Sequence, residues 1–126
     1  LVGASYFNPV DIGGINRSNL ETILDLLTND PNVDIVAMMR GIQRGRRNQE
    51  DLIAELKLYG QARDKSGKPM LAMFWTPVPY PDTASMEEID ETLRDLGIPI
   101  FPSPVRAARA LKKMVDYYRF RQSLEG

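Results

Sequence analysis

The sequence has 126 residues, of which 43% are hydrophobic and 26% are charged, and its formal net charge is -1. This length suits one packed domain and is too short for two, and the near-neutral charge argues against a nucleic-acid partner. The apolar runs are short and the first residues carry no signal-peptide pattern. We therefore expect a cytoplasmic protein that neither spans nor binds a membrane.

Cysteine and histidine are both absent from the chain. Their absence excludes disulfides, thiolate catalysis, an imidazole base, a phosphohistidine and any metal site built on these residues. We expect no catalytic residue, no metal site and no cofactor within this chain, so such chemistry would come from elsewhere. The first residue is Leu1 rather than Met, which we interpret as a sign that the chain is a piece of something larger.

Near the start, the run Asn-Pro-Val-Asp-Ile-Gly-Gly is typical of an ordered loop before a helix. Pro9 restricts its own φ angle and directs Asn8 toward extended geometry, while Gly13 and Gly14 permit backbone angles that a Cβ would forbid. The loop either contacts a ligand or another domain, or serves only as a tight turn. Asp11 is better suited to accept backbone N–H groups than to act as a base.

The following residues alternate between helical and strand patterns. A capping box of Ser18 and Glu21 predicts a helix that ends at Asn29-Asp30-Pro31. Residues 34–39 are apolar on both faces after the first position, which predicts a strand buried between two helical layers. Asn48 is the expected N-cap of the next helix.

The second half repeats the alternation. Residues 70–75 predict another doubly buried strand, followed by a proline-rich loop over residues 76–82. Ser85 with Glu88 predicts a capped helix that Gly97 ends. Residues 98–101 predict a short strand at a sheet edge, because Pro99 lacks a backbone donor, and Ser103-Pro104 begins the last helix.

Alternation of this kind predicts an α/β fold with a parallel sheet and right-handed crossovers. Ligands of such sheets bind at the carboxyl ends of the strands, here the loops at residues 40–47, 76–82 and 101–103. The first of these loops combines Gly41 with the guanidinium groups of Arg40, Arg44, Arg46 and Arg47, which suits either an anion site or a solvated basic loop. Core positions are expected for Met38, Met39, Met70, Met73, Phe74 and Trp75.

Several motifs together carry a resemblance to a known family. The Asn-Pro-Val-Asp-Ile-Gly-Gly run, Asn-Asp-Pro, Val-Asp before a strand, Gly-Lys-Pro and Gly-Ile-Pro occur in an order that resembles the nucleoside-diphosphate-forming acyl-CoA synthetases. The resemblance covers Asn8 to about Tyr118. It is to their second flavodoxin-like module, which is similar to the carboxy-terminal domain of the succinyl-CoA synthetase beta subunit.

The resemblance implies a flavodoxin-like three-layer fold, present as a partial domain with about three core strands and four helices. Residues 1–17 would be an N-terminal segment, residues 18–122 the CoA-ligase domain and residues 123–126 a tail. In the family a strand-helix-strand stretch with a first glycine-rich turn precedes the Asn-Pro-Val-Asp run, and residues 1–7 are too short to contain it.

The resemblance also implies an activity for the complete enzyme, which interconverts acyl-CoA, phosphate and ADP with acid, CoA and ATP through acyl phosphate and a phosphohistidine. CoA, ATP or ADP, and Mg²⁺ would be bound by the complete enzyme, whose CoA-binding and ATP-grasp domains lie on the same or a partner chain. The isolated chain would be inactive, and its share would be an anion site for the acyl or phosphate group.

The expected site residues fall into two groups, of which the resemblance itself implies Gly41, Ile42, Gln43 and Arg40, and helix N-termini and loop chemistry suggest the others. Substrate or phosphate binding is expected of Gly13, Gly14, Gly41, Ile42, Gln43 and Arg44. A loop or interface role is expected of Asn8, Pro9, Asp11 and Arg40, the last standing where the family often has a glycine. Replacing Gly41 with valine is expected to impair acyl-phosphate formation without unfolding the domain.

Two alternatives stay open at this point. The chain could be a non-catalytic flavodoxin-like assembly module that forms homodimers through an open strand edge. It could also be a receiver-like signalling domain, although the strand ends carry Arg40 and Thr76 in place of the acids that a phosphoacceptor site needs.

Overall fold

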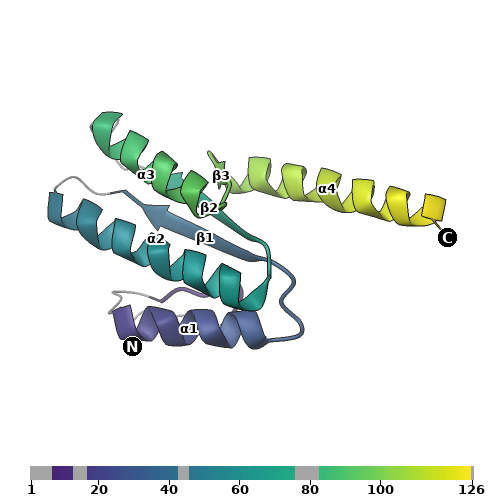
Figure 1. The fold of residues 1–126 in the computed structure, drawn as a ribbon, viewed down its shortest axis with the longest axis horizontal. Coiled ribbons are helices and arrows are strands. Elements are labelled where there is room, and N and C mark those ends of the chain that lie inside the picture. The colour runs from purple at the N-terminus through teal and green to yellow at the C-terminus, as the bar shows by residue number, and fades with distance from the viewer. Residues whose placement is uncertain (1–6, 13–16, 43–45, 76–82, 126) are drawn as a thin grey trace.

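The computed structural model describes residues 7–12, 17–42, 46–75 and 83–125. Four helices and three strands alternate along these residues (Figure 1). Their bounds are α1 (Arg17–Asn29), β1 (Val36–Gly41), α2 (Arg46–Ser66), β2 (Met70–Trp75), α3 (Thr83–Asp95), β3 (Ile100–Phe101) and α4 (Pro104–Glu125). The arrangement confirms the expected α/β fold and fits a partial flavodoxin-like domain.

The three strands form one parallel sheet in the order β1-β2-β3. Val36 pairs with Met70 at one end of the β1–β2 ladder, and Gly41 pairs with Trp75 at the other. The short strand β3 lies at the edge, as Pro99 predicted, and the Pro99 carbonyl accepts the Ala72 N–H at 2.9 Å. The strands therefore all end on the same side of the sheet.

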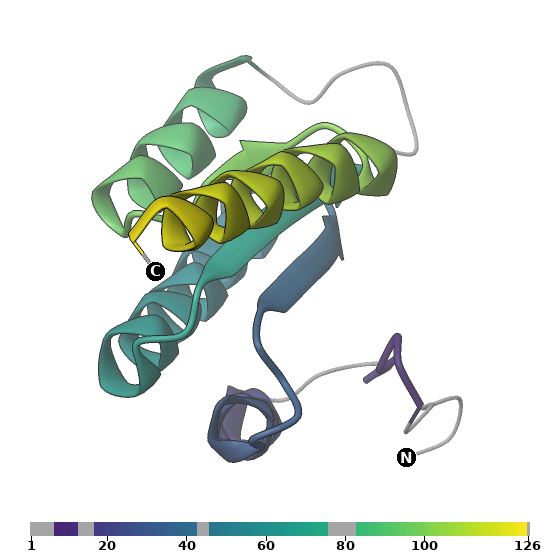
Figure 2. The same ribbon diagram turned by 90° about the vertical axis from the view of Figure 1, so that its right-hand side faces the viewer.

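The helices cover the two faces of the sheet unequally (Figures 1 and 2). Helices α2 and α3 pack on one face through a core of Leu52, Leu56, Ile89 and Leu93 around Ala72. Helix α1 lies beside α2 and adds a second cluster through its Leu20 and Leu24, which meet Val36, Ala62 and Met70. Among the described helices, α4 alone covers the opposite face, through Ala107 and Leu111 against Leu71, Met73 and Phe101.

The helix stops and the start of the last helix are those predicted, whereas the other N-caps are not. Gly97 follows the end of α3 with a φ angle of 63°. The Ile98 N–H donates to the Leu93 carbonyl at 2.8 Å, which is the hydrogen bond across six residues of a Schellman motif. At the start of α4, Ser103 Oγ accepts the Arg106 N–H at 3.3 Å, as an N-cap does. The other expected caps were wrong by two or three residues, because they lie inside the first turns of their helices: Ser18 in α1, Asn48 in α2 and Ser85 in α3.

The first strand departs from the sequence-based expectation. It spans Val36–Gly41 rather than residues 34–39, and its burial alternates, with Val36 and Met38 buried and Ala37 and Met39 exposed. A core position for Met39 was therefore wrong, since its side chain is 61% exposed. The physical reason is that α4 covers the β2 and β3 part of its face and leaves β1 open. Strand β2 is buried on both faces from Met70 to Met73, as predicted.

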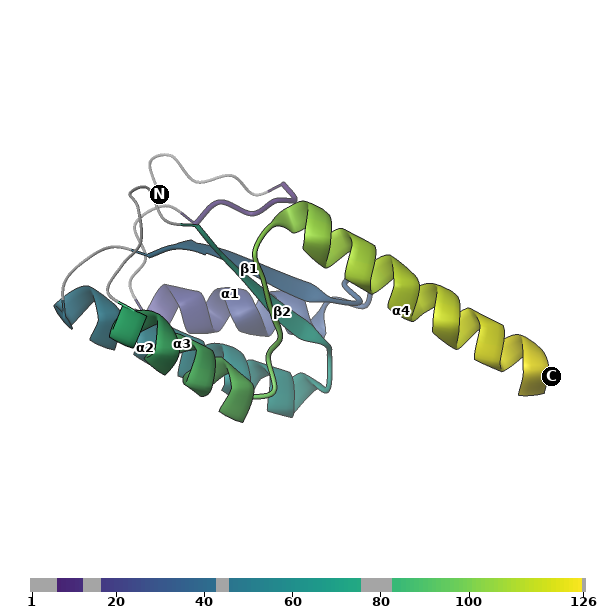
Figure 3. The same ribbon diagram turned by 90° about the horizontal axis from the view of Figure 1, so that it is seen from above.

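Helix α4 runs along the sheet only at its beginning and then projects away from it (Figure 3). Ala107 is its one buried residue. Residues 123–125, expected as a tail, continue the helix to Glu125. Within the described ranges, no helix combines the length and the apolar character needed to cross a bilayer.

Candidate functional site at the carboxyl edge of the sheet

The carboxyl end of β1 is held by a bidentate ion pair. Arg40 donates from Nε to Glu55 Oε2 at 3.0 Å and from Nη2 to Glu55 Oε1 at 2.8 Å. Glu55 comes from α2 and is only 8% exposed, whereas 39% of the Arg40 side chain is exposed. A guanidinium fork that already holds a carboxylate is a poor free anion ligand, so Arg40 serves first to tie β1 to α2.

Gly41 and Trp75 are paired neighbours at the same edge. A Cβ added to Gly41 would lie 3.1 Å from the Trp75 Cε2 and Cζ2 atoms, which is closer than side chains normally approach. The Ile42 N–H donates to the Trp75 carbonyl at 3.0 Å and is therefore used within the ladder. Glycine at position 41 lets the indole lie against the backbone, and a valine there requires Trp75 to shift.

An apolar surface extends from this edge along the part of the sheet that α4 leaves uncovered. We call it the open face and define it by Ala37, Met39 and Trp75, which share one side of the sheet by their spacing of two and their pairing. Trp75 was expected in the core, but it is 53% exposed. Exposed apolar residues grouped on a strand face are typical of an interaction surface.

The other expected site residues are not all described. Asn8, Pro9 and Asp11 are exposed on the segment that precedes α1, and the following Ile12 packs against the cluster formed by α1, α2 and β1. The Asn8–Pro9 peptide bond is cis. The remaining expected anion ligands lie outside the described residues: Gly13, Gly14, Gln43 and Arg44. The structure therefore brings together Arg40, Gly41 and Ile42 from the predicted set.

Two residues of this edge were missed in the sequence analysis. Glu55 stands three residues after Leu52 and four before Tyr59, so it belongs to the inward side of α2 despite its charge. The available signal was an acid on the apolar stripe of the helix that directly follows a strand ending in arginine. Trp75 gave no comparable signal, because a tryptophan at the end of an apolar strand is normally buried.

Burial also changes the ionisation of a tyrosine beside the ion pair. Desolvation raises the pKa of Tyr59 from 10 to about 12, and the negative charge of Glu55 adds to the rise while Arg40 opposes it. Tyr59 packs against both helical clusters and remains a neutral phenol at physiological pH. In the described part of the chain, no group of three or more acidic side chains is placed to hold a metal ion.

The carboxyl edge thus offers an ordered strand end, a half-exposed indole and an apolar face. These features suit contact with another protein surface or with the apolar part of a ligand. The predicted anion site depends on the loop that follows Ile42, and residues 43–45 of that loop lie outside the described residues.

Comparison with known proteins gives one informative relative. The chain is 30% identical over 115 residues to acetate-CoA ligase (ADP-forming) I of Archaeoglobus fulgidus. The aligned region covers 90% of this chain but only 14% of that ligase. No protein-family model matches the chain, and no solved structure matches it. The similarity supports a distant relationship to acyl-CoA synthetases over almost the whole chain.

Proposed function

We propose that this chain is one module of an ADP-forming acyl-CoA ligase and that it contributes binding surface rather than catalytic groups. The observation that carries the proposal is the 115-residue similarity to an ADP-forming acetate-CoA ligase, which runs through nearly every element of the fold. The absence of histidine agrees with it, since a phosphohistidine would then belong to another part of the enzyme.

In this proposal the open face packs against the rest of the enzyme. Met39 and Trp75 present apolar surface beside the strand ends, where ligands of parallel sheets bind. The Arg40–Glu55 pair anchors the end of β1 to α2. Gln43 and Arg44, which follow in the sequence, would meet the acyl or phosphate group. Gly13 and Gly14 would form a second cradle. CoA, ATP or ADP, and Mg²⁺ belong to the other domains.

The test uses the intact protein that carries this sequence. Purified protein is given an acyl-CoA, ADP and phosphate, and ATP and free CoA are measured together. We expect ATP to form in step with CoA release, with acetyl-CoA as the first substrate to try. An intact protein that releases no CoA and forms no ATP with any of a panel of acyl-CoA esters would contradict the proposal.

A pair of matched variants tests the role of the open face. Met39→Lys places a charge on this face, whereas Leu26→Lys places one on the outer side of α1, where Leu26 is similarly exposed at 68%. We expect turnover to fall at least tenfold in the first variant and to stay near wild type in the second, because only the first buries a charge at an interface. Equal activity of the two variants would show that the open face is not an interface in the enzyme.

Gly41→Val probes the strand end, and Trp75→Ala serves as its control. If the valine acts only by displacing the indole, both variants lose the same activity. If residue 41 lies against the acyl or phosphate group, Gly41→Val loses clearly more, and acyl-phosphate formation is the step affected. If the turnover of Gly41→Val equals that of the wild type, this edge of the sheet takes no part in the reaction.

A specific observation also favours a second candidate, a non-catalytic assembly module. Strand β1 is an edge of the described sheet, and its neighbouring face is apolar and exposed. Such an edge can pair with a second copy. Light scattering on the chain distinguishes the two, because a concentration-independent dimer that Met39→Lys dissociates favours assembly, and a monomer disfavours it.

A further inference from the structure

The outer half of α4 carries apolar side chains that nothing in the described chain covers. Tyr117 and Tyr118 pack edge to face with their ring centroids 5.6 Å apart, and both are exposed. Phe120 is 60% and Leu124 is 70% exposed. We call Met114, Tyr117, Tyr118, Phe120 and Leu124 the α4 stripe, because they recur at intervals of three and four residues and so occupy one broad side of the helix.

The stripe begins in a cavity of about 540 Å³ between α4 and the sheet. Most of its lining is apolar and includes Ile35, Leu71, Phe101, Leu111 and Met114. Met114 belongs to both the cavity and the stripe, so the apolar surface continues from the cavity onto α4. This helix projects away from the sheet (Figure 3). Such a surface can receive an apolar anchor in the hollow and a longer contact along the helix.

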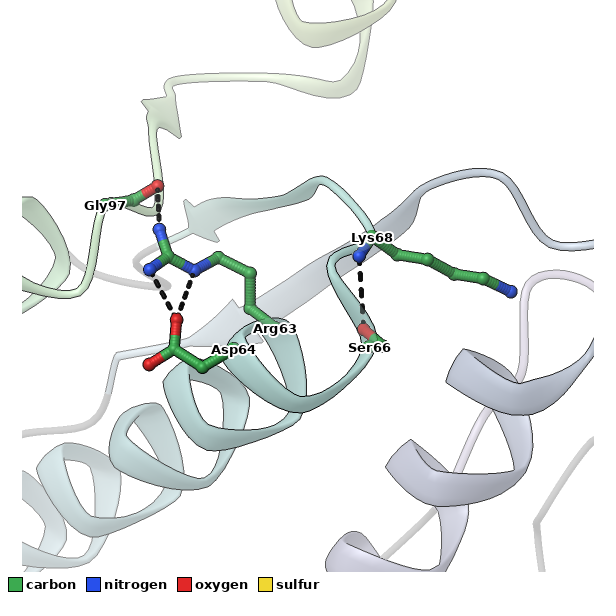
Figure 4. A network of polar contacts seen from close by, with 5 residues as sticks. All are labelled: Arg63, Asp64, Ser66, Lys68 and Gly97. Atoms are coloured by element: carbon green, nitrogen blue, oxygen red, sulfur yellow. Dashed lines mark hydrogen bonds and ion pairs between the residues drawn. The ribbon is translucent and has the colours of Figure 1, made fainter.

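The polar groups at the cavity rim already have partners. Arg63 donates to Asp64 Oδ1 from Nε at 3.1 Å and Nη2 at 2.6 Å, and from Nη1 to the Gly97 carbonyl at 3.2 Å (Figure 4). Lys68 Nζ donates to the Asp30 carbonyl at 2.6 Å. With these groups in use, the cavity suits an apolar side chain better than a charged metabolite.

Charge is distributed unevenly between α4 and the rest of the chain. Helix α4 has six basic and two acidic residues, whereas the remaining sequence has ten basic and fifteen acidic residues. Asp116 pairs with Lys112, and Glu125 pairs with Arg121. Within the described residues, the basic side chains of α4 that form no ion pair are Arg106, Arg109, Lys113 and Arg119.

We propose that the α4 stripe and its cavity dock a protein surface with an apolar centre and an acidic rim, supplied by another domain or chain. Two α4 helices packed together would oppose net positive charge to net positive charge, which disfavours a second copy of this helix. A lipid surface is flat and cannot fill the cavity at the base of the stripe. The proposal stands independently of the ligase activity.

The experiment places a photo-crosslinking amino acid, p-benzoylphenylalanine, at position 120 of the intact protein. Position 119 is the control, because it lies on the same turn but faces away from the middle of the stripe. After irradiation, the crosslinked peptides are identified by mass spectrometry. We expect position 120 to crosslink to a segment outside residues 1–126 that has Asp or Glu beside the crosslinked residue, with at least fivefold lower yield from position 119.

Charge dependence is tested in the same preparation. Lys113→Glu should lower the crosslinking yield from position 120 severalfold, and so should raising the salt from about 0.05 to about 0.5 M. Crosslinks confined to residues 104–125 of a second copy would overturn the proposal, as would crosslinks to lipid in the presence of anionic vesicles or none at all. ATP formation is measured on the same samples, so failure of docking and failure of the ligase proposal are recorded separately.

Discussion

The ion pair between Arg40 and Glu55 makes an asymmetric prediction about stability. Replacing Arg40 with methionine leaves the carboxylate of Glu55, whose side chain is 10% exposed, without its partner, which is among the costlier defects a fold can contain. Breaking a fully buried pair costs about 3 to 5 kcal/mol, and the partial exposure of Arg40 lets water reach the site. We therefore expect Arg40→Met to lower the free energy of unfolding by about 2 to 3 kcal/mol.

Glu55→Gln is the matched comparison. The amide keeps one hydrogen-bond acceptor for the guanidinium, and the exposed side of Arg40 can turn to water, so the expected loss is about 1 kcal/mol. The double variant Arg40→Met with Glu55→Gln leaves no orphaned charge and should recover part of the stability lost in Arg40→Met. The difference between the single and double variants gives a coupling energy that we expect to exceed about 1 kcal/mol.

Urea unfolding followed by the fluorescence of the single tryptophan, Trp75, measures all three variants. Tyr59 provides an independent readout in the same proteins. Because Glu55 raises its pKa and Arg40 lowers it, the pKa of Tyr59 should fall in Glu55→Gln and rise in Arg40→Met. Equal losses in the two single variants, or a coupling energy near zero, would refute a buried, one-sided ion pair.

Three further predictions concern turns, ionisation and capping. Gly67→Ala should lower the free energy of unfolding by about 1 kcal/mol, because residue 67 has a φ of 70° and otherwise has open space around it. Gly97→Ala should lower it by about 1 kcal/mol more, because the new Cβ at position 97 would lie 2.2 Å from Arg63 Nη1. The burial of neutral Tyr59 should contribute its full share of stability below pH 10, and the free energy of unfolding should fall by about 2 to 3 kcal/mol as the pH rises to 12. Tyr59→Phe should not show this fall. Ser103→Ala should cost about 0.5 to 1 kcal/mol by removing the α4 N-cap.

For each of these three predictions, one experimental result would contradict the physical reason given. Equal destabilisation by the two glycine substitutions would show that Arg63 moves without loss (Figure 4). An ultraviolet titration in which Tyr59→Phe removes a phenolate signal that develops near pH 10 rather than near pH 12 would contradict the burial effect on Tyr59. Wild-type stability in Ser103→Ala would mean that the last helix needs no side-chain cap.

Much of the fold could be predicted from local patterns. Strand β2 has its predicted bounds, and the stops at Asn29 and Gly97 are those expected, because proline and glycine impose backbone limits regardless of context. Helix starts were less accurate. Serine and asparagine also occur inside a first turn, where the backbone N–H groups lack partners, so the capping patterns placed these helix starts two or three residues late.

The candidate site was only partly predictable. Arg40, Gly41 and Ile42 lie together at a strand end, as the alternation implied, but the partner of Arg40 comes from a helix fifteen residues later. An ion pair between elements depends on how the helix is rotated and how far it lies along the strand. A local sequence pattern predicts neither the rotation of the helix nor its position along the strand, so Glu55 was missed.

The amino-acid sequence by itself determined the order of the elements, their parallel pairing and the absence of imidazole and thiol chemistry, because these follow from residue type and short-range spacing. Only the tertiary structure decided which apolar residues are covered. Met39 and Trp75 resemble core residues in the sequence, yet both are exposed, because α4 packs over β2 and β3 and then leaves the sheet. Burial depends on which surface lies opposite a side chain, and that surface comes from a distant part of the chain or from a partner.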